Sequence, residues 1–512
     1  MNTFKRKALF TAMVASVGAA GTAEAVYLSP NNTGQVLIYP YYTVQQTGGN
    51  AWNTYLSVVN TTSQVKAVKV RVLEGKTSAE VLDFNLFLSP NDVWTAAIIP
   101  ADATATGAGR IISADNSCIA PNQIGLTGQD FRNFQYAAGT GGSALPGVGL
   151  DRTREGYVEM IEMGVITGTS ATAVTHNSAG IPANCPAVQP LSFVPSAISA
   201  PSGGLMGTGT LINVNNGQDA GYKADALEAW SNVAQYSPPT STTPNLANAL
   251  PAVSLVVNAG GLDVNGASMR ATAYLTDFGA AALSGVPAGA RAVASVYMHS
   301  AVMNEYILDS ATRSNTDWVI TQPLKNLFVT NVTAATPYTA VMTSGGACES
   351  IGFTYFNREE ASATASGSDF SPTPPAGPAS SLCWESNVLS IRNGAGHMPT
   401  GIASGVLGSL NTTSVSVNSS FQNGWALLSF LGANAVSGMS GALATSQRVV
   451  LDQVGPVPAT VSTPGAVTFF GLPVTGFMIR NFQNGSLTCG TATCQGNYGS
   501  LFNHSYRTTI TP

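Results

Sequence analysis

Charge is scarce in this 512-residue chain. Asp, Glu, Lys and Arg make up 9% of it, whereas an ordinary soluble domain has roughly 25%. The 21 basic and 26 acidic residues give a formal net charge of −5 and form no basic patch. Because nucleic-acid-binding domains depend on such a patch, we do not expect a nucleic-acid partner. Apolar residues still make up 44% of the chain, so we predict a folded protein whose copies repel one another weakly.

The sequence also lacks the local patterns of common catalytic and metal sites. It has no H-E-x-x-H, no G-x-S-x-G and no P-loop. No two of its histidines share a metal-ligand spacing: His176, His299, His397 and His504. Residues 263–266 (Asp-Val-Asn-Gly) resemble the start of a calcium loop but lack the distal Glu, so we interpret them as a turn. We therefore predict a non-enzymatic protein with no catalytic, cofactor-binding or metal-binding residues and no cofactor.

Long hydrophobic runs are missing as well. No stretch reaches the roughly 18 apolar residues that a membrane helix needs, so we predict no transmembrane segment. The N-terminus instead has the three parts of a secretory signal peptide: basic residues at positions 5–7, a short apolar stretch at 8–21, and an A-x-A site at 23–25. We predict cleavage near Ala25 and a secreted or cell-surface protein.

Cysteine is present in an even number, which in an exported chain indicates disulfides. We predict that neighbours in the sequence pair, as Cys118–Cys185, Cys348–Cys383 and Cys489–Cys494. A zinc site is disfavoured because no two cysteines have the C-x-x-C spacing.

Residues 34–100 carry the clearest secondary-structure signal. In residues 65–74, Val68, Val70 and Val72 alternate with Lys69 and Arg71, which is the period of a half-buried strand. Residues 81–88 repeat the alternation, and a Ser-Pro-Asn-Asp turn follows them. We predict a sandwich sheet here with one face toward the core and one wet, charged face.

The rest of the chain shows more strand-like runs and one helical pattern. The runs include residues 156–166, 207–214, 253–257, 268–275, 292–298, 318–321, 338–343, 351–356, 388–391, 426–430 and 467–470. In residues 219–230, apolar residues fall at i, i+4, i+5 and i+8, which predicts a short helix: Tyr222, Ala226, Leu227 and Trp230. The proline-rich stretch at 182–205 indicates a boundary or a long loop, and the one at 236–251 indicates another loop.

We therefore predict a mainly β protein of antiparallel β-sandwich domains, Ig-like or jelly-roll-like, with long loops and one short helix. The expected organisation is a signal peptide at 1–25, an N-terminal β-sandwich at 26–200, and a second β-rich domain at 201–512 with the helix near 219–231.

Two residue groups are candidates for binding or chemistry. Arg358, Glu359 and Glu360 form a dense charge cluster, which is either a carboxylate site, a polar contact with another copy, or a simple ion pair at a strand end. Four aromatic residues near the N-terminus are either sugar-stacking groups or part of the core: Tyr39, Tyr41, Tyr42 and Trp52.

Three stretches support a broad resemblance: LDFNLFLSPNDVWTA at 82–96, SNTDWVITQP at 314–323 and FTYFNREE at 353–360. They resemble uncharacterised secreted or cell-surface β-rich proteins of Gram-negative bacteria. That resemblance implies an exported surface protein.

Export, low charge and the absent catalytic patterns together predict a structural surface protein, such as a surface-layer, matrix or filament subunit. Its expected partners are copies of itself or other envelope components, and strand addition by the tail at 505–511 is one expected mode. The alternatives are an adhesin or carbohydrate-binding protein with a glycan ligand, and a secreted hydrolase using Glu359 or Glu360.

Overall fold

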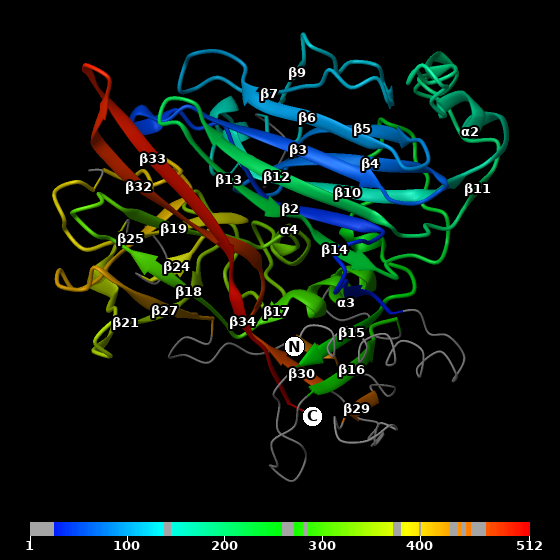
Figure 1. The fold of residues 1–512 in the computed structure, drawn as a ribbon. Coiled ribbons are helices and arrows are strands. Elements are labelled where there is room, and N and C mark those ends of the chain that lie inside the picture. The colour runs from blue at the N-terminus through cyan, green and yellow to red at the C-terminus, as the bar shows by residue number, and fades with distance from the viewer. Residues whose placement is uncertain are drawn as a thin grey trace.

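Strands dominate the molecule, which confirms the predicted mainly β class (Figure 1). The computed structural model describes residues 25–137, 145–258, 271–279, 285–371, 380–398, 401–430, 439–441, 447–451 and 467–511. Among these residues the α-helices are few and short: α2 (Gly168–Val174), α3 (Ala288–Tyr297) and α4 (Lys325–Phe328).

Two antiparallel sheets form a sandwich from the first half of the chain. The larger sheet orders β1 (Tyr27–Leu28), β14 (Asp225–Glu228), β2 (Val36–Thr43), β10 (Glu155–Ile166), β4 (Val65–Glu74), β5 (Glu80–Leu88) and β8 (Cys118–Ala120), with β11 (Ile198–Ser199) beside β10. The second sheet orders β13 (Gln218–Lys223), β12 (Leu205–Asn213), β3 (Trp52–Asn60), β6 (Val93–Pro100), β7 (Gly109–Ile112) and β9 (Gln129–Asp130).

The apolar sides of these two sheets pack against each other. Val68, Val70 and Val72 of β4 share one hydrophobic cluster with residues of the opposite sheet. Across this core, the rings of Phe84 on β5 and Trp94 on β6 lie 5.7 Å apart. The apolar half of the alternation in residues 65–88 therefore points into the core, as predicted.

The sandwich extends past residue 200. Strand β12 pairs with β3, β13 pairs with β12, and β14 pairs with β2. Residues 205–228 thus belong to the same sheets as the strands before them, although the predicted domain division falls at residue 200.

The second half of the chain forms further sheets. One orders β22 (Ser362–Thr364), β21 (Gly352–Asn357), β27 (Asn423–Ser429), β18 (Ala301–Ile307) and β34 (Ser505–Arg507). Another orders β23 (Phe370–Ser371), β26 (Thr412–Ser416), β25 (Ser386–Arg392), β19 (Asn315–Thr321), β32 (Thr475–Cys489) and β33 (Ala492–Asn503). Smaller sheets are formed by β15 (Val253–Asn258), β16 (Ala271–Asp277) and β29 (Gln447–Leu451), by β28 (Met439–Gly441), β30 (Val467–Phe470) and β35 (Thr509–Thr511), by β17 (Met298–His299) and β31 (Leu472–Pro473), and by β20 (Glu349–Ser350) and β24 (Ser381–Leu382).

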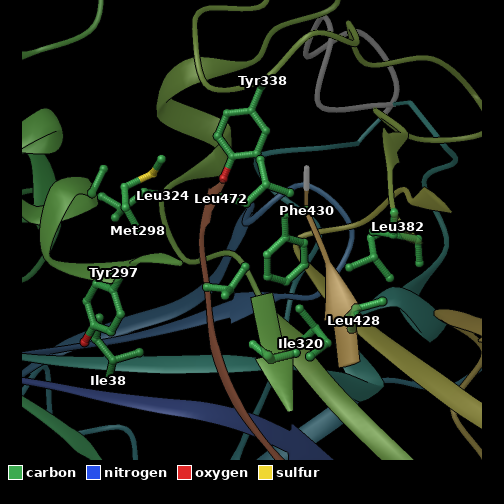
Figure 2. Close-up of a cluster of buried hydrophobic side chains, with 14 of the residues drawn as sticks. Ile38, Tyr297, Met298, Ile320, Leu324, Tyr338, Leu382, Leu428, Phe430 and Leu472 are labelled. Carbon is green, nitrogen blue, oxygen red and sulfur yellow. The ribbon is translucent and has the colours of Figure 1, made fainter. Parts of the chain in front are cut away.

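The two halves share packing. A second hydrophobic cluster joins Ile38 of β2 to Tyr297 of α3 and continues through β19, β27 and β31 (Figure 2). At another point the long hairpin of β32 and β33, red in Figure 1, lies beside the first sandwich, where the Asn497 side chain donates to the Asn216 carbonyl at 2.9 Å. The later sheets are therefore packed directly on the first sandwich.

The predicted helix at 219–230 is wrong, because this stretch forms strands β13 and β14. Residues of β13 alternate between buried and exposed, and Tyr222 is one of the buried ones. The helix-like spacing of the apolar residues in the sequence obscures this strand pattern. An Asn-Asn-Gly sequence at 215–217 links β12 to β13, with Gly217 at a φ of 60°. Pairing with β12 on one strand and with β2 on the other decides the structure, which local periodicity cannot foresee.

A helix forms where the sequence predicts a strand. Residues 292–298 read as a β-run, but most of them lie in α3, all but the first residue of which is buried. A short, mostly apolar run such as this one looks the same whether it is a buried strand or a buried helix. In α3 the alanines at 288, 290, 292 and 294 favour the helix.

The predicted cysteine pairing is confirmed. Disulfides join Cys118 to Cys185, Cys348 to Cys383 and Cys489 to Cys494. The first ties β8, at the edge of the larger sheet, to the segment that follows α2. The third closes the end of the β32–β33 hairpin.

Candidate functional site

The charged side of β4 is buried, so the predicted wet face is wrong. Lys66 and Lys69 are fully buried, and Arg71 is nearly so. Lys66 pairs with Glu162 of β10 at 2.7 Å, and Lys69 pairs with Asp83 of β5. Charge in this part of the molecule is therefore used inside the fold.

Arg71 is the centre of this buried layer. Its guanidinium contacts Glu80 at 2.8 Å and Glu159 at 2.5 Å. A bulge in the β4–β5 pairing skips Val81, which brings Glu80 to the same face as Asp83. The three central strands thus supply both signs of charge to one face.

Loops from later in the chain cover this face. The Lys66 ammonium also contacts the Ser202 hydroxyl at 2.7 Å, and Lys69 donates to the Pro239 carbonyl at 3.3 Å. The Asn85 side chain donates to the Ser237 carbonyl at 2.9 Å. The proline-rich stretches that the sequence marks as loops are therefore the lid over the charged face.

Burial shifts the titration of these groups. It raises the pKa of Glu159 and of Glu162, and the neighbouring cations Arg71 and Lys66 oppose the shift. Pairs of this kind recover much of their desolvation cost but add little net stability. We interpret them as a structural layer, since each carboxylate is held by its partner and none lines the cavity at Glu385 or the groove at the β32–β33 hairpin.

Two more carboxylates hold residues 404–411: Glu155 on β10 of the first sandwich and Asp317 on β19 of the later sheets. Glu155 accepts from the hydroxyls of Tyr41 at 2.7 Å and Ser409 at 2.6 Å. Asp317 accepts from the backbone amides of Val406 and Leu407 at 2.8 and 2.9 Å. Both carboxylates accept several hydrogen bonds from the protein, so we interpret them as structural too.

Glu385 is the exception among the buried acids. It is fully buried, yet neither of its carboxylate oxygens has a hydrogen-bond partner of standard geometry. Burial is the largest influence and raises the pKa of Glu385 to about 8, against opposing effects of the Lys325 charge, the Ser78 hydroxyl and the Asn326 backbone amide. Glu385 lines a cavity of about 270 Å³ whose other walls are Thr77, Asn326, Val329, Thr330, Asn331 and Met342.

The outer face of the second sheet contrasts with this buried charge. Apolar side chains on it are 37% to 61% exposed: Tyr55, Val93, Met206, Ile212 and Val214. We call these five residues the neutral face. They lie on or directly after the adjacent strands β3, β6 and β12.

Several charged residues lie at the margins of the neutral face. Asp219 and Lys223 are exposed on the edge strand β13, and Arg110 lies on β7. The positions between them on β12, β3 and β6 hold Thr, Ser, Asn, Ala and apolar side chains.

The aromatic candidates for sugar stacking are not on the surface. Tyr39, Tyr41, Tyr42 and Trp52 are all buried. Their core interpretation is therefore confirmed, and a glycan site built on them is ruled out.

The charge cluster at 358–360 lies on an exposed turn after β21. Arg358 and Glu359 form an ion pair at 3.5 Å, with about two thirds of each side chain exposed (67% and 65%). Glu359 and Glu360 line neither the cavity at Glu385 nor the groove at the β32–β33 hairpin. This agrees with a simple ion pair at a strand end.

The histidines are dispersed. His299 stacks on Tyr506, and His504 contacts the Val319 carbonyl at 3.1 Å. His176 contacts Ser89, and His397 contacts the Ser314 carbonyl. Among the residues that the structure describes, no three His, Cys, Asp or Glu side chains gather as metal ligands would. The turn expected at 263–266 lies outside the described residues.

The C-terminal tail pairs within its own chain. Strand β34 adds to β18, and β35 adds to β30. Each tail strand therefore lies at the edge of a sheet and is paired on one side within its own chain. Strand addition to another copy stays a prediction.

Comparison with known proteins gave no match to a family model, to a curated protein or to a solved structure. No helix among the described residues has the length and apolar character needed to cross a bilayer. The candidate sites therefore rest on geometry alone. Sequence reasoning missed both Glu385 and the neutral face. The alternation at 207–214 was a usable signal for the second, whereas Glu385 has no local signature.

Proposed function

We propose that this protein is an exported structural subunit of the cell surface that assembles with copies of itself through the neutral face. The main observation behind the proposal is where charged and apolar residues lie. Ion pairs are buried under loops, while an apolar, uncharged sheet face is exposed to solvent. Exposed apolar patches mark interaction surfaces, and interface centres are poor in Lys, Glu and Asp and rich in Tyr and Met.

The margins of the neutral face fit a two-fold contact. Asp219 and Lys223 lie four residues apart on the edge strand β13, and both are exposed. In an isologous interface the same patch of both copies meets across a two-fold axis, so a residue i of one copy contacts a residue j of the other, and j contacts i. The Lys223 ammonium of one copy can then approach the Asp219 carboxylate of the other.

The test is the assembly state of the purified protein, measured by mass photometry and negative-stain microscopy across a range of concentrations. We expect dimers or larger regular assemblies, and we expect the double variant Tyr55→Lys/Ile212→Lys to be monomeric. Val332→Lys is the matched control, because Val332 is 76% exposed but lies outside the neutral face. A wild-type protein that stays monomeric at high concentration, or a double variant that assembles normally, would overturn the proposal.

Glycan binding is a second candidate, supported by a groove at the β32–β33 hairpin. The groove has a volume of about 570 Å³ and is lined by Ala311, Thr312, Arg313, Phe482, Gln483, Asn484 and Tyr498. Phe482 and Tyr498 are cross-strand partners, and the Arg480 guanidinium lies over the Phe482 ring. Aromatic rings beside amide and guanidinium groups suit the apolar faces and hydroxyls of sugars.

A glycan array tests this second function. We expect wild-type binding to be lost in Tyr498→Ala and kept in Tyr55→Ala, since Tyr55 is the exposed tyrosine of the neutral face. An array without hits, or equal binding by both variants, would remove the glycan candidate and leave the assembly proposal untouched.

A further inference from the structure

The cavity at Glu385 has a surplus of hydrogen-bond acceptors. Both carboxylate oxygens of Glu385 and the side-chain oxygen of Asn326 are buried without a hydrogen-bond partner of standard geometry, although the Ser78 hydroxyl and the Asn326 backbone amide lie near the carboxylate. Both residues line the cavity, which Thr77 of the first sandwich closes from the opposite half of the chain. Acceptors without donors are costly in a protein interior, so the site is chemically suited to a ligand that brings donors.

The chain's own nearest cation does not fill this role. The Lys325 ammonium donates to the Ala347 carbonyl at 2.6 Å and to the Trp384 carbonyl at 3.4 Å. It forms no ion pair with Glu385 in the part of the chain that the structure describes. Its charge therefore acts on Glu385 only at a distance.

The lining decides which class of donor fits. Calcium takes six to eight oxygen ligands and usually several carboxylates, whereas this cavity offers a single carboxylate beside two amide and two hydroxyl side chains. Met342 and Val329 add apolar wall. An ammonium group carries three donors and a positive charge, and a short alkyl chain suits such walls.

We propose that the cavity between Glu385 and Asn326 binds a primary alkylammonium group, with the ammonium donating to the Glu385 carboxylate and the Asn326 side-chain oxygen and the alkyl chain lying against Met342 and Val329. The ligand class includes free amines and lysine side chains. This site is independent of the neutral face, which lies on a different sheet.

Isothermal titration calorimetry of the full chain with n-butylamine tests the proposal, with 1-butanol as a neutral ligand of the same size and shape. We expect saturable binding of the amine and none of the alcohol. Glu385→Gln keeps the shape but removes the charge, and we expect it to weaken binding roughly 10- to 100-fold. Glu359→Gln, on the exposed turn, should bind as the wild type does.

A second variant guards against misfolding of Glu385→Gln. Asn331 is exposed at the cavity, so Asn331→Trp should block entry without touching the carboxylate. We expect it to reduce binding as well. Failure of the amine to bind at tens of millimolar, equal binding of amine and alcohol, or unchanged binding in both variants would overturn the proposal.

Affinity should also depend on pH. The other titratable groups that act on the Glu385 carboxylate or that it acts on are Lys325, Glu74, Tyr157 and Tyr338. Because burial raises the pKa of Glu385 to about 8, a proton competes with the ligand below that pH. We expect amine affinity to rise roughly tenfold between pH 7 and pH 9. An affinity that stays flat or falls over this range would contradict the assigned carboxylate.

Discussion

In the first sandwich a charged sheet face is buried and an apolar sheet face is exposed, which is the reverse of what their residues suggest. The face of β4 that carries Lys66, Lys69 and Arg71 is buried. The outer face of β12, β3 and β6, which carries the apolar residues of the neutral face, is open to solvent. Alternation in a strand therefore tells which residues share a face, but it does not tell which face meets water.

The difference arises from what covers each face. Loops 200–204 and 236–243 supply carbonyl and hydroxyl groups to the cations of β4. No described segment does the same for the neutral face, whose residues stay more than a third exposed. Because the chain has few charges and several are buried, the electrostatic repulsion between copies is weak.

The largest expected effect comes from breaking the buried charge layer. Arg71→Met leaves Glu80 and Glu159 without their cation, and removing one member of a buried pair typically costs about 3–5 kcal/mol of unfolding free energy. Arg358→Met removes the cation of the exposed pair and should change stability by less than about 0.5 kcal/mol. Urea denaturation measures both. Similar small losses in the two variants would mean that the β4 face is solvated.

The next largest effect is expected from disulfide removal, which should cost more stability in the first sandwich than in the β32–β33 hairpin. The Cys118–Cys185 loop spans 67 residues and the Cys489–Cys494 loop spans 5. The chain-entropy relation gives about 4 kcal/mol for the first and about 2 kcal/mol for the second. Paired Cys→Ala variants, compared by thermal unfolding under equal conditions, should keep this order. The reverse order would show that local packing outweighs chain entropy here.

A smaller effect should follow from pH. Burial raises the pKa of Glu385 to about 8 and that of Glu228 to about 7. Between pH 6.5 and pH 8 the folded state therefore holds protons that the unfolded state has released, so stability falls as pH rises. The expected loss is about 1–3 kcal/mol, and Glu385→Gln should remove the larger part of it. A stability that increases over this window would contradict the burial of both acids.

The neutral face should matter least to the stability of the monomer. Tyr55→Lys replaces an exposed side chain, so its unfolding free energy should stay within about 0.5 kcal/mol of the wild type. Chemical denaturation at a concentration where the protein is monomeric measures this. A loss above about 2 kcal/mol would place Tyr55 in the fold rather than at an interface.

Much of the first sandwich was predictable, because period-2 alternation and turn residues lie next to each other in residues 34–100. The pairing of the six cysteines was also predictable from their order. The strands at 218–228 and the helix at 288–297 were not predictable. Strand pairing and burial overrode local spacing in the first, and a short, mostly apolar run is ambiguous in the second.

The candidate sites depended still more on tertiary structure. Tyr41 and Trp52 look like surface aromatics in the sequence but lie in the core. Glu385 follows Cys383 and Trp384 with nothing to mark it, and its cavity exists only because residue 77 and residues 326–342 come together in the fold. Such convergence of distant segments leaves no local pattern.

Lysine labelling tests the central claim most directly, namely that the charges of β4 are inside the fold. Beyond residue 25 the sequence has five lysines: Lys66, Lys69, Lys76, Lys223 and Lys325. Acetylation of the native protein, read by peptide mass spectrometry, should modify the exposed Lys223 and leave Lys66 and Lys69 unmodified until the protein unfolds. Modification of Lys66 and Lys69 at the rate of Lys223 would contradict the account.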